Sequence, residues 1–255
     1  MTSVAFLNLM PNKIETERQW LHIICPQQHD LEWKPCITAS YQPKHTPLSA
    51  LLPRYTVGLP DAFDILVVTG APLGQKPFQE IVYWQELQRI FKHCEDRAIP
   101  IFASCWAAHA LLLARYQLPV QVRSEKLFGV FSHTQTMQHA ITQKLPKELY
   151  LPHSRYAFIA AEVLRNKSQL TPLLESEAAG PSLILTQDHN LLLLGHPEYA
   201  QDTLLFEYQR DKRRGLSTAL PEGLDATHAN ADNLPVWQNY GQVIFAEWLA
   251  FLRSN

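Results

Sequence analysis

Short apolar runs alternate with segments of helical spacing through much of the chain. In the first half the strand-like runs occupy residues 4–9 (VAFLNL), 63–70 (FDILVVTG) and 99–105 (IPIFASC). Segments whose apolar residues recur three or four positions apart follow them, at 11–25, 77–97 and 106–116. Strands that alternate with helices are typical of a parallel sheet covered on both faces. The pattern therefore predicts an α/β fold, doubly wound and mostly parallel, with flanking helices.

The second half continues the alternation and ends in a helix. Further strands are predicted at 126–133, 182–188 and 191–198, followed by a helix over 201–215, a loop over 220–235 and a closing amphipathic helix near 239–252. Gly215 stands where a helix C-cap is expected. Because 255 residues can bury one large core, we expect a single domain over 1–255.

Composition and charge exclude several classes of partner. The net charge is −2, and the basic run at 210–214 is typical of a solvated helix face, apart from its first residue, so we expect no nucleic-acid partner. No apolar stretch is long enough for a bilayer and no signal peptide opens the chain, which predicts a cytoplasmic protein with no membrane partner. The four cysteines, Cys25, Cys36, Cys94 and Cys105, have no metal-ligand spacing, so we expect free thiols and no metal.

Candidate chemistry begins at Cys105, where the third predicted strand turns into a helix. In a doubly wound sheet the carboxyl ends of the strands carry the functional residues. The amide groups at a helix N-terminus stabilise a thiolate and can also donate hydrogen bonds to an oxyanion on an attacked carbonyl. A single cysteine is also a common core residue, so Cys105 alone does not decide between the two roles.

Two further strand ends complete the candidate site. In 191–199 (LLLLGHPEY) the proline favours an extended backbone, so His196 and Glu198 project to the same side and the carboxylate can orient the imidazole as a general base. In 67–78 (VVTGAPLGQKPF) the glycines expose backbone amides without a Cβ, which suits an oxyanion site. The backbone N–H groups expected to donate to the oxyanion are those of Gly70, Ala71 and Trp106. Too few glycines are present for a nucleotide-binding loop.

The cysteine, histidine and glutamate arrangement, including H-P-E, is similar to that of class I glutamine amidotransferases, although A-S-C-W-A at 103–107 replaces their G-x-C-x-G. A closer resemblance covers nearly the whole chain. The segments LNLMPNKIETERQ, TGAPLG, CWAAHALL, EKLFGVFSH, LPHSRY, GHPEY and EYQRD occur in the order expected for the homoserine O-acyltransferase family. The chain resembles the homoserine O-succinyltransferases, which implies a class I glutamine amidotransferase-like (flavodoxin-like) fold.

The resemblance implies roles at the matching positions. Cys105 would form the acyl-thioester, with His196 as general base and Glu198 as its partner. The substrate-binding residues would be Lys126, Ser154 and Arg210, of which Arg210 offers a forked donor for a carboxylate and Lys126 a compact cation. Glycine at Gly74 would admit the longer, charged succinyl group, where glutamate accompanies acetyl transfer. The expected reaction is ping-pong succinyl transfer from succinyl-CoA to homoserine in methionine biosynthesis. Acyl-CoA would be a co-substrate, with no resident cofactor.

Some departures from the family keep alternatives open. Members carry a leading segment before the N-L-M-P motif, which begins here at Asn8, and VWQNYG (236–241) stands where W-R-x-H-G is expected. Serine is an alternative acceptor, because one methylene is worth only about 1 to 3 kcal/mol of discrimination. An amidase acting on glutamine and a catalytically silent binding protein are the other hypotheses. A homodimer also stays open.

Overall fold

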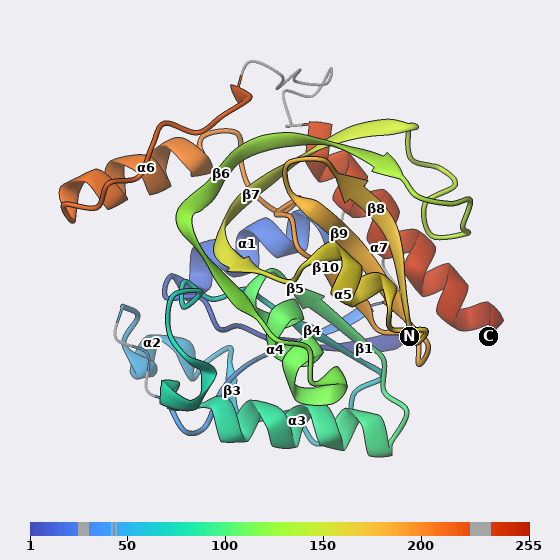
Figure 1. The fold of residues 1–255 in the computed structure, drawn as a ribbon. Helices are drawn as coiled ribbons and strands as arrows, with labels where there is room; N and C mark the ends of the chain where they lie inside the picture. Colours follow the sequence, from blue (N-terminus) through green and yellow to red (C-terminus); the bar gives the residue numbers. More distant parts are fainter. Residues whose placement is uncertain (25–30, 42, 44, 225–235) are drawn as a thin grey trace.

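A ten-stranded sheet forms the centre of the computed structural model, which describes residues 1–24, 31–41, 43, 45–224 and 236–255 (Figure 1). Its strands lie in the order β3-β2-β1-β4-β5-β10-β9-β8-β6-β7. The strands are β1 (Thr2–Leu7), β2 (Leu31–Ile37), β3 (Thr56–Val57), β4 (Ile65–Val68), β5 (Ile101–Ser104), β6 (Gln121–Gln135), β7 (Glu148–Phe158), β8 (Leu170–Ser176), β9 (Gly180–Thr186) and β10 (Leu191–Leu193). The helices are α1 (Lys13–Ile24), α2 (Leu48–Leu51), the 3₁₀ turn η1 (Phe78–Glu80), α3 (Trp84–Asp96), α4 (Trp106–Tyr116), α5 (Ala161–Arg165), α6 (Thr203–Arg213) and α7 (Val236–Ser254).

The parallel half of the sheet is covered by helices on both faces. β1 to β5 and β10 run parallel to their neighbours within this half. Successive residues of β4 enter opposite cores: Ile65 and Val67 pack with α1 and α7, whereas Leu66 and Val68 pack with α3 and α4. All four residues of β4 are buried, as expected for a strand with helices on both sides. The predicted doubly wound architecture is confirmed.

An antiparallel extension continues the sheet beyond β10. β9, β8, β6 and β7 each pair antiparallel with the preceding strand, and β6 and β7 form a long hairpin that arches over the ends of the parallel strands (Figure 1). The sequence pattern predicted only the central part of β6 and missed β2, β3, β7 and β8. The amphipathic segment at 77–97 is likewise divided, into η1 and α3.

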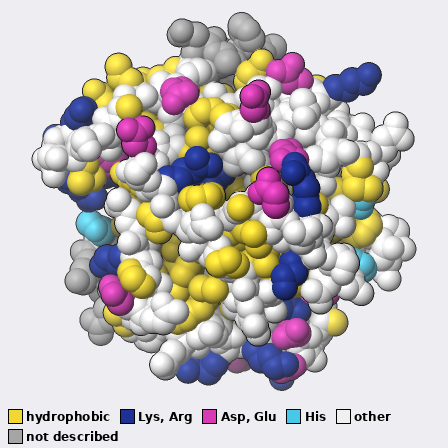
Figure 2. All heavy atoms as spheres, viewed as in Figure 1, with side chains coloured by type: hydrophobic (Ala, Val, Ile, Leu, Met, Phe, Trp, Pro, Cys, Tyr) yellow, Lys and Arg dark blue, Asp and Glu magenta, His cyan; other side chains and the backbone are white. Residues whose placement is uncertain are grey.

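Several smaller predictions can also be compared with the structure. Gly215 has a φ of +72° and donates its N–H to the Lys212 carbonyl at 3.0 Å, which confirms the predicted end of α6. Cys36, Cys94 and Cys105 are free thiols, whereas Cys25 and residues 225–235 of the predicted loop lie outside the described residues. No helix among the described residues is long and apolar enough to cross a membrane. Positive and negative side chains are interspersed on the face shown in Figure 2.

Candidate active site

Cys105 occupies a sharp turn between β5 and α4. Its φ of +47° and ψ of −108° are uncommon for a residue with a Cβ, and such strained turns hold nucleophiles at strand ends in other folds. The Cys105 N–H donates to the Leu193 carbonyl at 2.7 Å, and its carbonyl accepts from the N–H of His109 at 3.2 Å. The thiol is 6% exposed and lines a cavity of about 260 Å³. The turn therefore fixes the sulfur at the edge of the cavity.

A buried histidine supports this turn from within α4. His109 is fully buried, and its Nδ1 lies 3.0 Å from the Cys105 carbonyl oxygen, so Nδ1 donates the hydrogen bond. Burial lowers the pKa of His109 to about 3, which keeps the ring neutral. This histidine lies in the CWAAH segment, but the sequence offered no signal for its role.

His196 lies opposite Cys105 and is held by β7 and by its own loop. The His196 N–H donates to the Pro152 carbonyl at 2.8 Å, and its Nδ1 lies 2.7 Å from Glu198 Oε1. The ring stacks on Tyr199 with centroids 4.3 Å apart. Burial lowers the pKa of His196, but the neighbouring Cys105 and Glu198 outweigh this effect and hold that pKa well above its usual range. The arrangement favours an imidazolium facing Cys105.

α7 packs directly on the loop that carries His196 and Glu198. A Cβ built on Gly241 would lie 2.9 Å from the Cβ of Pro197, so helix and loop are in contact at the residue between the two functional side chains. Trp237 also donates from Nε1 to the Tyr199 carbonyl at 2.7 Å. The last helix of the chain therefore positions the predicted base, although the two are about forty residues apart in sequence.

The glycine loop after β4 approaches the nucleophile closely. A Cβ on Gly70 would lie 3.3 Å from Cys105 Cβ and 3.7 Å from His196 Cε1, which is tight packing. Thr69 Oγ1 donates to the Gly70 carbonyl at 3.0 Å and fixes the orientation of this loop. Ala71 and Trp106 line the cavity, and among the described residues no protein acceptor takes their backbone N–H groups. These two N–H groups are therefore open to a ligand.

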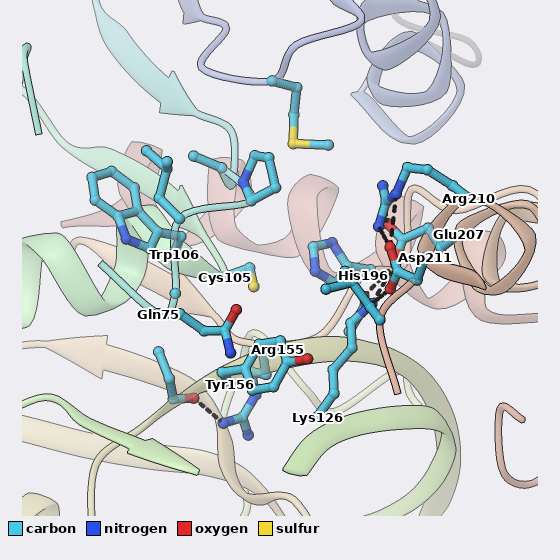
Figure 3. A pocket seen from close by; sticks show the side chains of 18 of the residues that line it. Gln75, Cys105, Trp106, Lys126, Arg155, Tyr156, His196, Glu207, Arg210 and Asp211 are labelled. Atoms are coloured by element: carbon cyan, nitrogen blue, oxygen red, sulfur yellow. Dashed lines mark hydrogen bonds and ion pairs between the residues drawn. The ribbon is translucent and has the colours of Figure 1, made fainter. Parts of the chain in front are cut away.

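A wall of charged side chains closes the other side of the cavity (Figure 3). Lys126 Nζ lies 3.3 Å from Glu207 Oε2 and 3.1 Å from Asp211 Oδ2. Ser154 donates its hydroxyl to Glu207, and Arg210 donates from Nε and Nη2 to Asp211 Oδ1 at 2.9 and 2.8 Å. Lys126, Ser154 and Arg210 are thus brought together, and their common partners are two acids that the sequence reasoning missed.

The two cations and two carboxylates of this wall balance one another in charge. Burial raises the pKa of Glu207, but Lys126, Ser154 and Arg210 outweigh this and hold that pKa below its usual value. Burial also raises the pKa of Asp211, but Arg210 and Lys126 outweigh this and hold that pKa below its usual value. Both carboxyls are therefore ionised at neutral pH. The E-x-x-R-D spacing in EYQRD, which puts an acid one helical turn before Arg210, was the available signal for Glu207.

The cavity collects most of the predicted site residues. Gly74, Cys105, Lys126, Ser154, His196 and Arg210 line it, whereas Gly70 and Glu198 lie directly behind the lining. Gly74 packs against β7, where a Cβ would meet the Ala157 nitrogen at 3.4 Å. Arg155, also on β7, is a lining residue that the sequence reasoning missed. No cluster of three or more histidine, cysteine or acidic side chains suited to a metal occurs among the described residues.

The whole chain matches a family model described as homoserine O-succinyltransferase, over residues 1–255. A homoserine O-succinyltransferase of Shewanella baltica is 36% identical over 256 residues, which cover 97% of this chain and 81% of that protein. One of Aliivibrio fischeri is 38% identical over 257 residues, with coverage of 97% and 81%. The chain belongs to the homoserine O-succinyltransferase family. Membership of this family makes it an acyltransferase.

Several solved structures are similar in fold to this member of the homoserine O-succinyltransferase family. A glutamine amidotransferase of Thermotoga maritima superposes with a TM-score of 0.67 at 10% identity, covering 100% of this chain and 99% of that chain. One of Methylobacillus flagellatus gives a TM-score of 0.65 at 12% identity, with coverage of 98% and 95%. At such identities the likeness concerns the fold alone, and the predicted class I glutamine amidotransferase-like fold is confirmed.

Proposed function

We propose that this chain transfers the succinyl group of succinyl-CoA to the hydroxyl of homoserine through an acyl-cysteine at Cys105. Family membership supports the donor, the acceptor and a place in methionine biosynthesis. The single observation that carries the mechanism is the placement of His196 between Cys105 and Glu198 at the ends of two adjacent parallel strands. Acyl-CoA and homoserine are the small-molecule partners, and no resident cofactor enters the reaction.

The first half-reaction uses the thiolate and imidazolium together. The Cys105 sulfur attacks the thioester carbon, and the backbone N–H groups of Ala71 and Trp106 donate to the oxyanion that forms. When the carbon–sulfur bond to CoA breaks, the leaving thiolate takes the proton from His196. Gly70 contributes by letting this loop approach the nucleophile. The products are free CoA and a succinyl thioester on Cys105.

The second half-reaction reverses the proton transfer. Neutral His196 takes the proton of the acceptor hydroxyl, whose oxygen attacks the acyl-enzyme and displaces the Cys105 thiolate, which restores the starting ion pair. Glu198 stabilises the imidazolium in both steps. The product is an O-succinyl amino acid, and the proton lost from the hydroxyl balances the one carried away by CoA.

The charged wall suits an acceptor that is an α-amino acid. Homoserine carries a carboxylate, for which Arg210 offers a fork, and an ammonium, for which the ionised Glu207 is an acceptor. Lys126 and Ser154 hold Glu207 in place from the β6–β7 hairpin. Serine offers the same two charged groups with a hydroxyl one methylene closer, so acceptor choice depends on the depth of the cavity.

The experiment is intact-protein mass spectrometry after mixing with succinyl-CoA, followed by a chase with homoserine or serine. Wild-type protein is expected to gain one succinyl group, which homoserine discharges with release of the O-succinyl product. Cys105→Ser is expected to gain none, whereas Cys94→Ser, which changes a buried cysteine outside the cavity, retains the adduct. A folded Cys105→Ser variant with wild-type turnover would contradict the mechanism. Discharge of the acyl-enzyme by serine but not by homoserine would show that serine is the acceptor.

A further inference from the structure

Arg155 is a buried cation in the wall of the active-site cavity. The residue is 5% exposed and lies on β7 among the lining residues. Its Nε donates to His153 Nδ1 at 3.3 Å, its Nη1 to the Ala157 carbonyl at 2.7 Å and its Nη2 to the Ala179 carbonyl at 2.6 Å. No carboxylate in the described part of the chain pairs with it. A guanidinium has five N–H donors, so two of them have no protein acceptor among the described residues.

The neighbouring histidines supply no compensating charge. Because Arg155 can only donate, His153 Nδ1 accepts and its proton lies on Nε2, which is 3.1 Å from His133 Nε2. His133 in turn donates from Nδ1 to the Phe131 carbonyl at 2.8 Å. Burial lowers the pKa of His153 well below its usual value and that of His133 to about 4. The pair is therefore a neutral support beneath the guanidinium.

A second cation lies nearby and increases the demand for an anion. The Arg123 guanidinium carbon lies 4.8 Å from the centroid of the Phe158 ring, and its buried Nε has no partner among the described residues. Burial, and to a smaller extent Arg123, lower the pKa of Arg155 to about 10, so Arg155 stays protonated at neutral pH. A buried charge without a partner is expensive, and proteins keep such groups where a ligand supplies the counter-charge.

Arg155 shares its cavity with Cys105 and with Gly74, the residue expected to make room for the acyl chain. Cys105 and Arg155 line the same cavity together with Gln75 and Tyr156, and Figure 3 shows these four side chains. Gly74 faces the same strand, against Ala157, which accepts a hydrogen bond from Arg155. A succinyl group differs from acetyl by one further methylene and a terminal carboxylate, the anion that this end of the cavity lacks.

We propose that Arg155 binds the distal carboxylate of the succinyl group, so that it selects the acyl donor while Gly74 leaves room for the chain to reach it. The inference rests on the proposed function, because it requires an acyl group on Cys105. Arg155 is in this view a specificity-determining residue, and the wall of Lys126, Glu207 and Arg210 is left for the acceptor. Loss of Arg155 should therefore slow acylation only by donors whose acyl group carries a distal carboxylate.

The test compares succinyl-CoA with butyryl-CoA, which has the same chain length but a methyl group in place of the carboxylate. The rate of Cys105 acylation is followed by rapid quench and intact mass in wild type, Arg155→Gln and Arg155→Lys. A lost charge-assisted hydrogen bond predicts that the succinyl-to-butyryl ratio of acylation rate constants falls about 10- to 100-fold in Arg155→Gln. Arg155→Lys, which retains the charge without the fork, should lie between the two.

Both rate constants are measured on the same variant. Partial unfolding or a weaker nucleophile therefore lowers both and leaves their ratio unchanged. Arg115→Gln changes another largely buried arginine, outside the cavity and ion-paired with Glu95 and Asp188, and its ratio should equal that of wild type. An unchanged ratio in Arg155→Gln, with both donors slowed equally, would overturn the inference while leaving acyl transfer intact. A wild type that forms no acyl-cysteine with either donor would overturn the proposed function itself, and this inference with it.

Discussion

Gly241→Ala is a change far from the reacting atoms that should nevertheless reduce turnover. A Cβ at Gly241 would lie 2.9 Å from Pro197 Cβ and 3.1 Å from Ile23 Cγ2, whereas ordinary contact begins near 3.4 Å. Either α7 or the loop must therefore shift by about 0.5 Å. Because Pro197 joins His196 to Glu198, a shift of the loop changes the position of the base relative to Cys105.

Two opposite effects on stability have to be weighed. Alanine in a helix interior is favoured over glycine by about 1 kcal/mol. Forcing an extra carbon into a packed contact costs about 1 to 3 kcal/mol. We therefore expect a free energy of unfolding between unchanged and about 2 kcal/mol lower. A misplacement of 1 Å in catalytic geometry costs about 100-fold in rate, so half of that predicts a loss of about tenfold in kcat.

The assay measures kcat with succinyl-CoA and homoserine, together with urea unfolding at neutral pH. Gln242→Ala is the matched control, because Gln242 is the next residue of α7 and bonds the His22 carbonyl at 2.9 Å without touching the loop. Gln242→Ala should retain turnover while weakening the contact between α7 and α1. A Gly241→Ala protein that is more stable than wild type and equally active would refute the view that α7 positions the base.

Two further substitutions test the charges of the site. In Glu198→Gln the pKa of His196 should fall, because Glu198 helps to raise it, so the basic limb of the acylation rate against pH should move to lower pH; an unmoved limb would contradict the role of Glu198. In Lys126→Met two buried carboxyls lose a cation, and the free energy of unfolding at neutral pH should fall by about 3 kcal/mol. Since the pKa of Glu207 is lowered in the folded state, its contribution is present above the ordinary value of 4.5 and is lost as the pH falls below it. The deficit measured by urea unfolding should therefore shrink at pH 4, and an equal deficit at both pH values would argue against the ion pair.

Local sequence patterns determined the parallel half of the fold and the positions of the proposed reacting groups. The runs that became β4 and β5 are apolar except for Ser104, because helices cover both faces, so they stand out without tertiary information. Cys105 comes directly after β5, whereas β10 ends at Leu193 and not at 198 as predicted, so His196 and Glu198 lie in the turn that follows it. Parallel strands bring their carboxyl ends to one edge, which places the three residues together. The family resemblance then added Lys126, Ser154 and Arg210, of which Lys126 and Ser154 by themselves are typical of surface residues.

Tertiary structure alone decided the partners of these groups. Lys126 meets Glu207 and Asp211 across 81 and 85 residues of chain, and no local periodicity encodes such a pairing. β7 was missed because its mixture of histidine, serine and arginine does not alternate between polar and apolar residues, yet α4 and α7 pack on it and bury about half of its residues. Burial of Arg155 without an acid follows from that packing. Whether a side chain is solvated or desolvated depends on what the rest of the chain packs over it, and a sequence pattern carries that information only where neighbours in sequence are also neighbours in space.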